Sequence, residues 1–356
     1  MNRDDLEALI QSGETGKDLD LQGVDLSGAD LSGGVFEACD FSGATLAGAT
    51  FRESMINNCR FVGADLSGAN LRLAMVADGD FTDARFCNAT LAAVKMGRCK
   101  LRGADLSGAR MEIGAFAHVG LQRARFGGCH IDRTTFADCT LEETDLRATH
   151  YRQATMMKVD LTTCLLDDAT FEMCLLADNR FTGMNLSGKR FDRCIFMGSD
   201  FTGANLTGAD ITQCNFKSAV LDDARLEGAR ADRALFVEAS LKRVAARGAK
   251  LRQALFVKAT LDGADLRGAD LYQAIFHDAS VRGAVIVGAE LTYADLSRAD
   301  FGGADLRDST MFRAILAGVK ADRTAWPLSR ATALEYDPEL QRAVEWRRTH
   351  PNPQRS

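Results

Sequence analysis

A five-residue repeat constrains this fold more than any other feature of the sequence. From Leu21 to Leu316, every residue at this period is Leu, Phe, Ile, Met, Val or Tyr except Ala231 and Ala246. All of the Phe residues but Phe312 occupy these positions. No insertion or deletion breaks the phase. A period of five fits neither an α-helix nor a plain β-strand, so it predicts a chain that turns a corner every five residues.

A second position, two residues before each bulky one, is small. Between Val24 and Ala314 it holds Ala, Gly, Cys, Ser, Thr or Val with three exceptions, which are Asn179, Met184 and Lys189. We therefore expect each segment to point one large and one small side chain inward, with turn-forming and polar residues between them. A buried, unpaired Lys is costly, so we expect either a bulge that turns Lys189 to solvent, which we favour, or a partner group that satisfies it. Such a bulge is also a candidate docking feature.

The repeat resembles that of the pentapeptide-repeat family, whose motif is A(D/N)LXX. The segments that match the motif directly are Ala29-Asp30-Leu31-Ser32-Gly33, Ala64-Asp65-Leu66-Ser67-Gly68 and Ala204-Asn205-Leu206-Thr207-Gly208. The resemblance covers about residues 20–325. It implies an all-β solenoid, a right-handed quadrilateral β-helix with four pentapeptides per coil and about 15 coils. At a strand spacing of about 4.8 Å, such a rod is roughly 70 Å long.

The length of 356 residues then predicts one long solenoid instead of several domains. We expect an N-terminal capping helix within residues 1–20, the β-helix over 21–325, and a C-terminal helical cap and tail over 326–356. The first helix is expected at 3–12, with Leu6, Leu9 and Ile10 on one face. The second is expected to begin at Asp337-Pro338 and to run to about Arg348, because Asp is a favoured N-cap and Pro a favoured first helical residue. Such caps cover the open ends of a solenoid.

Composition excludes several classes of protein. The net charge of −6 excludes a generic polycationic nucleic-acid binder. No apolar run is long enough to predict a membrane span, and the acidic start MNRDDLEALIQSGETG lacks the features of a signal peptide. We therefore expect a cytoplasmic protein that contacts neither membrane nor nucleic acid directly.

The ten cysteines are interpreted as core spacers. Nine lie at the small inward position, namely Cys39, Cys59, Cys99, Cys129, Cys139, Cys164, Cys174, Cys194 and Cys214, and only Cys87 points outward. No CxxC pair occurs, and free thiols suit a reducing compartment. His130 and His150, which are four pentapeptides apart, are expected to stack on an outer face, where two imidazoles are a weak signal for metal. We expect no metal and no cofactor.

The same regularity argues against catalysis. An enzyme needs a pocket with convergent polar groups, and the unbroken phase leaves no inserted loop to build one. The sequence contains no GxSxG, P-loop or HExxH motif. We expect no enzymatic activity and no catalytic residues; the remaining place for a pocket is the interruption from Asn179 to Lys189.

One outer side is apolar. The residue before each bulky one points outward, and every twentieth residue from Val35 onward is more often large and apolar than not. Met157, Met197, Val237 and Val257 widen this stripe. An extended apolar stripe marks an interface, and we expect the main contact between Leu175 and Ile275. The predicted partner-binding residues are Leu175, Ile195, Leu235, Val237, Leu255, Val257, Ile275 and Ile315.

Three partners fit the stripe: the chain's own C-terminal helix, a second copy forming a homodimer through the C-terminal region, or another protein. Charge offers a second surface. Residues 1–70 carry 12 acids and 4 bases, and a basic patch follows later. The patch comprises Arg225, Arg230, Arg233, Lys242, Arg243, Arg247, Lys250, Arg252 and Lys258, and would suit an acidic partner. We expect no aromatic side chains among these bases, which argues against a single-strand nucleic-acid platform.

Two functions follow. The first is a non-catalytic rigid scaffold that holds a protein partner; the opening DLDLQGVDLSGADLSG resembles pentapeptide-repeat proteins found beside bacterial type VI secretion components, which implies an adaptor for effectors. The alternative is a DNA-mimicking modulator of DNA gyrase, like the quinolone-resistance members of the family. The acidic residues 1–70 fit a mimic of duplex DNA, whereas the neutral-to-basic remainder does not.

Overall fold

The structure is a computed structural model, and it describes residues 1–336 together with Arg342 and Trp346. The chain divides into two compact units, Met1–Phe181 (unit 1) and Thr182–Ser356 (unit 2). Each unit is described by itself below.

Each unit is a parallel β-solenoid in which residues four pentapeptides apart pair through the backbone. In unit 1, Val35 pairs with Met55 and Asp25 with Thr45, and in unit 2, Leu235 pairs with Leu255. Bridges of this kind recur at every fifth residue, so a coil takes four pentapeptides and has four sides. The predicted quadrilateral β-helix is confirmed.

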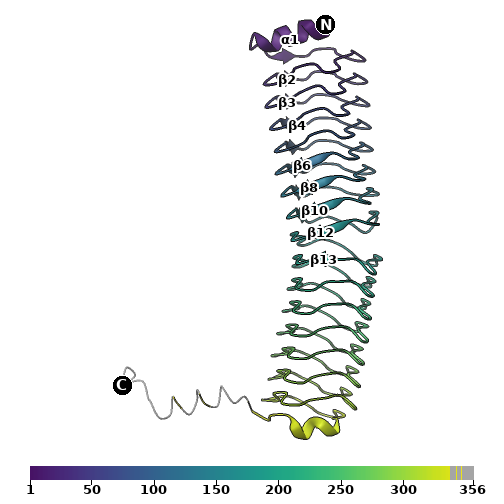
Figure 1. Cartoon of the computed structure of the whole chain (residues 1–356), viewed down its shortest axis with the longest axis vertical. Helices are drawn as coiled ribbons and strands as arrows, with labels where there is room; N and C mark the ends of the chain where they lie inside the picture. Colours follow the sequence, from purple (N-terminus) through teal and green to yellow (C-terminus); the bar gives the residue numbers. More distant parts are fainter. Residues whose placement is uncertain (337–341, 343–345, 347–356) are drawn as a thin grey trace. The chain divides into compact units, whose positions relative to one another are not determined.

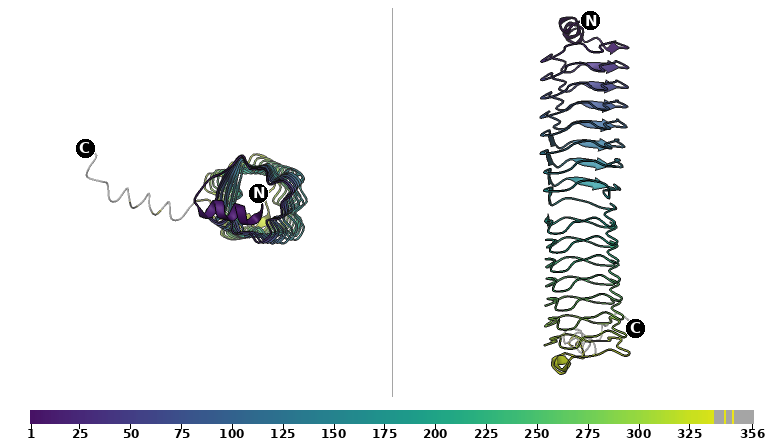
Figure 2. Two further views of the ribbon diagram at one scale, coloured as in Figure 1. Left: turned by 90° about the horizontal axis from the view of Figure 1, so that it is seen from above. Right: turned by 90° about the vertical axis from the view of Figure 1, so that its right-hand side faces the viewer.

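Unit 1 begins with helix α1 (Arg3–Gln11) and continues into short parallel strands. Eight of them form one sheet in the order β1-β2-β3-β4-β5-β7-β9-β11, and they lie one above another in the right-hand view of Figure 2. A second side carries β12, β10, β8 and β6 in that order. The strands of unit 1 are β1 (Gly16–Lys17), β2 (Val35–Glu37), β3 (Met55–Asn57), β4 (Met75–Ala77), β5 (Lys95–Gly97), β6 (Arg110–Glu112), β7 (Ala115–Ala117), β8 (His130–Asp132), β9 (Thr135–Ala137), β10 (His150–Arg152), β11 (Thr155–Met157) and β12 (Thr170–Glu172).

Unit 2 contains β13 (Phe191–Asp192) and the short 3₁₀ helix η1 (Leu328–Thr332). The other pairings in its described part are mostly single-residue bridges between equivalent positions of successive coils, for example Ala245 with Asp265. Both units therefore follow one rule of construction.

The corners explain the polar residues of the repeat. Asp25 accepts hydrogen bonds from the backbone N–H and the hydroxyl of Ser27, at 3.0 and 2.6 Å, which closes a tight turn. The next corner residue, Gly28, has a φ of +64°. This left-handed conformation costs Gly little, whereas it is unfavourable for a β-branched residue such as Ile113, whose φ is +60°.

The core consists of the bulky and small residues that the repeat places inward. Phe41, Phe61 and Phe81 are fully buried and stack on one another, with ring centroids 4.6 and 4.7 Å apart. Small residues such as Ala44 and Ala64 fill the space beside them and are also buried. Since every coil contributes large and small inward side chains, the core runs through each unit in continuous columns.

The three exceptions at the small position are accommodated in different ways. Asn179 stays buried, because its Oδ1 accepts from Val159 N–H at 2.9 Å and its Nδ2 donates to the carbonyl of Met156 at 3.0 Å. Met184 is buried and Lys189 is half-buried. The backbone of Lys189 keeps the regular pattern, with its carbonyl accepting from the N–H of Asp210 at 2.8 Å. The backbone is therefore regular between Lys189 and the next coil, whereas the bulge expected in the segment from Asn179 to Lys189 stays a prediction.

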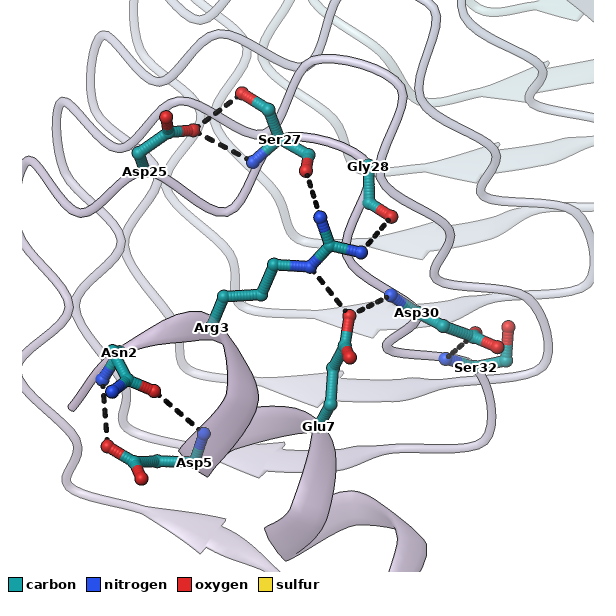
Figure 3. A network of polar contacts seen from close by, with 9 residues as sticks. All are labelled: Asn2, Arg3, Asp5, Glu7, Asp25, Ser27, Gly28, Asp30 and Ser32. Atoms are coloured by element: carbon teal, nitrogen blue, oxygen red, sulfur yellow. Dashed lines mark hydrogen bonds and ion pairs between the residues drawn. The ribbon is translucent and has the colours of Figure 1, made fainter.

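Helix α1 covers the first coil of unit 1 (Figures 1 and 3). Asn2 and Asp5 form a capping box at its start, and Leu6 is fully buried. Arg3 donates to the carbonyls of Ser27 and Gly28, both at 3.0 Å, and Glu7 accepts from the backbone N–H of Asp30 at 2.9 Å. These bonds satisfy backbone groups that the first coil would otherwise present to solvent.

The end of unit 2 is covered by residues after the last repeat. Leu334 pairs with Ile315, and Ser329 donates its hydroxyl to the carbonyl of Ser309 at 2.6 Å. The rings of Trp326 and Phe301 lie 6.4 Å apart. The helix expected from Asp337 to about Arg348 lies outside the described residues, apart from Arg342 and Trp346.

Leu6 is expected to be the main apolar contact of the N-terminal cap. We predict that Leu6→Ala lowers the free energy of unfolding of the first coils by about 2–5 kcal/mol, because a buried Leu is replaced by a cavity. Amide hydrogen exchange at residues 16–40, followed by mass spectrometry, measures this. Leu9→Ala, at a half-buried position of the same helix, is the matched control; an equal effect of both variants would contradict the assignment.

Candidate binding surface

Most of the predicted stripe forms a continuous ladder in unit 2. Backbone bridges join Ile195 to Asn215 and continue, one coil at a time, to Ile315. At a strand spacing of about 4.8 Å, successive side chains of this column lie in contact distance of one another. We call its apolar members the Leu–Ile ladder: Ile195, Leu235, Leu255, Ile275 and Ile315, with Val237 and Val257 beside them.

A stack of phenylalanines lies behind the ladder. Each of the first ladder positions is followed by an inward Phe, and the rings of Phe196, Phe216, Phe236, Phe256 and Phe276 stack at 5.0, 5.2, 5.2 and 4.7 Å. These rings are fully or almost fully buried. Because the stack and the backbone ladder hold each residue from both sides, the outer surface is presented rigidly.

All eight predicted partner-binding residues are half-buried. Stacking explains this, since each outward side chain covers the flank of its neighbour one coil away. Leu175 lies in unit 1, where it pairs with Thr155. The expected contact from Leu175 to Ile275 is thus divided between the two units, and the other seven residues lie in unit 2.

Two polar residues interrupt the ladder. Asn215 separates Ile195 from Leu235, and Asp295 separates Ile275 from Ile315. Asp295 accepts from the Nε2 of His277 at 2.6 Å and from the backbone and hydroxyl of Ser297 at 3.0 and 2.5 Å. Its charge is therefore engaged within the unit, and the longest apolar run is Leu235, Leu255 and Ile275.

Several apolar side chains outside the Leu–Ile ladder are more exposed. In unit 1 they include Met55, Met75 and Ile113, which are 44%, 50% and 58% exposed. In unit 2, Met197, Tyr293 and Phe312 are 41%, 41% and 50% exposed, and Tyr336, Trp346 and Leu328, which follow the last repeat, are 55%, 62% and 100% exposed. Met55 and Met75 belong to the stripe that the sequence predicts, although they are not among the predicted partner-binding residues. Ile113, Tyr293 and Phe312 lie outside that stripe.

Tyr293 and Phe312 belong to an aromatic cluster that contradicts the expectation of bases without aromatic neighbours. The rings of Tyr272 and Tyr293 meet edge to face at 5.9 Å, and those of Tyr293 and Phe312 at 5.8 Å. Arg252, a member of the expected basic patch, lies 4.5 Å above the Tyr272 ring. A signal was available, because Phe312 is the one Phe outside the five-residue phase.

The expected basic patch is partly neutralised. Several of its arginines pair with acids one coil away, among them Arg243 with Asp223 at 2.6 Å and Arg247 with Asp265 at 2.5 Å. Arg267 and Arg247 together hold the pKa of the Asp265 carboxyl down at about 2. Exposed pairs of this kind add little stability, but they remove much of the positive field that an acidic partner would need at this place.

The cysteines lie as the core-spacer interpretation places them. The nine at the small position are buried, and Cys87 is half-buried. Burial raises the pKa of the Cys129, Cys164 and Cys214 thiols to about 12. Such thiols carry little thiolate near neutral pH, so they are poor nucleophiles and poor metal ligands.

His130 and His150 stack as expected in unit 1, with ring centroids 5.4 Å apart. The Nδ1 of His150 lies 2.9 Å from the hydroxyl of Thr170. Both rings line a cavity of about 360 Å³ with Asp132 and Glu172. Nowhere in the described part of the chain do three or more His, Cys, Asp or Glu side chains gather as metal ligands would. Within the same residues, we find no helix with the length and hydropathy of a membrane span.

Comparison with protein families places the repeat in a known group. A model described as a pentapeptide repeat region matches residues 29–111. A second, described as pentapeptide repeats in eight copies, matches residues 174–213, 214–253, 239–278, 249–286 and 289–324. No curated protein matches the sequence.

Several solved structures match parts of this chain. HetL, a pentapeptide repeat protein involved in heterocyst differentiation regulation in the cyanobacterium Nostoc, is 24% identical, with 80% of this chain and 96% of HetL covered and a TM-score of 0.23. A trypsin-treated form of QnrB1, a plasmid-mediated fluoroquinolone resistance protein, is 21% identical over 56% of this chain and 92% of its own, with a TM-score of 0.29. The tailspike protein of phage Dettilon is 11% identical over 85% and 62%, also with a TM-score of 0.29.

Thiol accessibility tests the placement of the cysteines. We predict that at pH 8 an aromatic disulfide reagent labels one thiol, Cys87, within minutes, and that all ten react after unfolding in guanidinium. The reason is that the other nine thiols are packed inside the coils. Cys87→Ser is the control and removes the rapid signal. Rapid labelling of a second thiol in the folded protein would show that the reagent reaches a cysteine inside the coils, which would contradict the prediction.

Proposed function

Because the chain belongs to the pentapeptide-repeat family, we propose that it is a non-catalytic, rigid scaffold that binds a protein partner through the Leu–Ile ladder. The observation that carries this proposal is the run Leu235, Leu255 and Ile275 over a stack of phenylalanines. Apolar area of this kind is a common basis of protein association.

Rigidity supports the proposal as much as apolarity does. The backbone N–H of Leu255 donates to the carbonyl of Ala234 at 3.0 Å, and the carbonyl of Leu255 accepts from the backbone N–H of Phe236 at 2.7 Å. A partner therefore meets a surface that is already ordered, so that association loses little backbone entropy.

The engagement of the reactive side chains supports a non-catalytic role. The candidate nucleophiles are mostly core cysteines with raised pKa values, as for Cys214. Many aspartates accept turn hydrogen bonds or pair with arginines, as Asp265 does. Side chains held in this way stabilise the coils and are poorly suited to proton transfer.

The identity of the partner stays a prediction. The prediction of an adaptor in type VI secretion is based on the resemblance of residues 18–33. The prediction of a homodimer through the C-terminal region is based on the apolar stripe. We also propose a cytoplasmic location, which suits the buried free thiols. No direct contact with nucleic acid or membrane belongs to the same proposal.

DNA mimicry is the second candidate, and the 12 acids of residues 1–70 favour it. In the first coils, backbone bridges place Asp20 beside Asp40 and Asp25 beside Thr45, so carboxylates line the outer sides. A DNA gyrase supercoiling assay tests this candidate. On the scaffold proposal we expect neither inhibition nor protection of the enzyme at micromolar protein; either effect would favour the mimic.

The scaffold proposal predicts the effect of charge on the ladder. Leu235→Asp with Leu255→Asp is expected to leave the circular dichroism spectrum unchanged, because both side chains point outward, and to abolish the partner contact or the dimer. Light scattering gives the mass, and affinity purification from the native host with mass spectrometry gives the partner.

A matched control carries the same added charge on other sides of the same coils. Ala245 and Thr260 are half-buried and outward, so Ala245→Asp with Thr260→Asp should keep both mass and partner. An unchanged mass and an unchanged set of purified proteins for the ladder variant would count against the proposal.

A further inference from the structure

The aromatic cluster of unit 2 is a surface that the scaffold proposal does not use. It lies at one corner of the coils and in the position next to it. We call it the Tyr–Arg corner; it comprises Arg233, Gln253, Gln273, Tyr293 and Arg313 at the corner, with Arg252, Tyr272 and Phe312 beside them.

The corner column retains large side chains at a conformation that favours glycine. Tyr293 and Arg313 have φ values of +59° and +54°. Another corner column of the same unit is glycine in six successive coils, at Gly188, Gly208, Gly228, Gly248, Gly268 and Gly288. Because left-handed backbone is unfavourable for residues other than Gly, the corner keeps these side chains where glycine would cost less.

The side chains of the corner hold one another in place. Arg233 Nε donates to Gln253 Oε1, and Gln253 Nε2 donates to Gln273 Oε1, both at 2.8 Å. The backbone N–H of Tyr293 donates to the carbonyl of Phe312 at 2.9 Å. From Arg233 to Arg313 the column extends over about 19 Å at the usual strand spacing, which is enough for about six residues of an extended peptide.

An arginine lies over one face of the Tyr272 ring and one face of the Tyr293 ring. Arg252 lies 4.5 Å above the ring of Tyr272, and Arg313 lies 6.0 Å above the ring of Tyr293. The rings also meet edge to face, at 81° and 83°. A nucleic-acid platform needs open ring faces on which bases stack, and the arginines over Tyr272 and Tyr293 reduce the number of such faces.

The arginines, in contrast, keep donors for a ligand. A guanidinium that stacks on an aromatic ring retains its in-plane N–H groups, which match the two oxygens of a carboxylate. In the described part of the chain, neither Arg233 nor Arg313 makes an ion pair, although Arg252 pairs with Asp270 at 3.3 Å. Arg233 and Arg313 lie at opposite ends of the corner, with the exposed Phe312 beside Arg313.

We propose that the Tyr–Arg corner binds an acidic, aromatic-containing segment of a protein partner. Carboxylates of the segment pair with Arg233 and Arg313, and its apolar side chain packs on Phe312 and the edge of Tyr293. Tyr and Arg are enriched among the residues that dominate protein interfaces. The inference rests on the proposed function in that the partner is a protein, and it adds the chemistry that this partner presents.

A displayed library of random dodecapeptides provides the probe. Selection on the full-length protein is expected to enrich peptides that combine Asp or Glu with an aromatic residue. For a fluorescein-labelled enriched peptide, anisotropy should show an affinity at least tenfold weaker for Tyr293→Ala with Phe312→Ala and for Arg313→Gln. Replacing the acids of the peptide by Asn and Gln should weaken binding similarly.

Two controls separate this inference from the proposed function. Leu235→Asp with Leu255→Asp should leave peptide binding unchanged. If this variant abolished peptide binding and the corner variants did not, the peptide would bind at the Leu–Ile ladder, and the inference about the Tyr–Arg corner would be wrong. The opposite result is also distinguishable. If the ladder variant kept its mass and its set of purified proteins, and only the corner variants lost peptide binding, the corner inference would be supported and the proposed role of the Leu–Ile ladder would be wrong. Circular dichroism melting checks that each variant is folded.

Three results would overturn the inference. The first is enrichment of basic or neutral peptides, or binding that the corner variants do not change. The second is micromolar binding of an oligothymidylate that Tyr293→Ala with Phe312→Ala abolishes, which would assign the corner to nucleic acid. The third is self-association, measured by sedimentation, that the same variant abolishes, which would assign it to a second copy of this chain.

Discussion

The backbone hydrogen bond between successive coils is the interaction on which the rest of each unit depends. It holds Leu235 on Leu255 in unit 2 as it holds Val35 on Met55 in unit 1. Because every coil has the same length, each residue type builds a column, and a column of any chemistry can be made without loops. A single inserted residue would move all later side chains to another column, which is why the unbroken phase matters more than any individual residue.

The two candidate surfaces of unit 2 are both columns, but they differ in what stacking does to them. In the Leu–Ile ladder, side chains of similar shape cover each other's flanks, so each is half-buried and the surface is smooth. In the Tyr–Arg corner, long side chains project from backbone of positive φ, and Phe312, in the position beside this column, is 50% exposed. The first surface offers apolar area, and the second offers guanidinium donors beside aromatic rings. A partner that used both would meet them side by side, since Arg313 and Ile315 are separated in the chain by Ala314 alone.

Much of the candidate ladder could be predicted, because it depends only on which residues share a column. Leu235, Leu255 and Ile275 lie together for that reason alone. The aromatic corner was missed because Tyr272, Tyr293 and Phe312 occupy adjacent columns in three different coils, and only the stacking of coils brings the rings to centroid distances of 5.9 and 5.8 Å. The neutralisation of the basic patch also depends on side-chain direction: Arg243 pairs with Asp223 of its own column, whereas Arg247 pairs with Asp265 of a neighbouring column. Asn179 shows a third case, in which a polar side chain stays buried at a small inward position because it hydrogen-bonds to the backbone of Val159 and Met156.

By itself, the sequence determined the fold class, the inward and outward positions, and the columns, because all three follow from the period of five and from the alternation of large and small residues. The tertiary structure alone decided how exposed each outward residue is and which charged partner it has. Both depend on contacts between coils about 4.8 Å apart, where the length and direction of a side chain, and not its position in the repeat, select its neighbour. Phe312 illustrates the difference: its position lies outside the phase of the repeat, and its role beside Tyr293 and Arg313 emerges only when the coils are stacked.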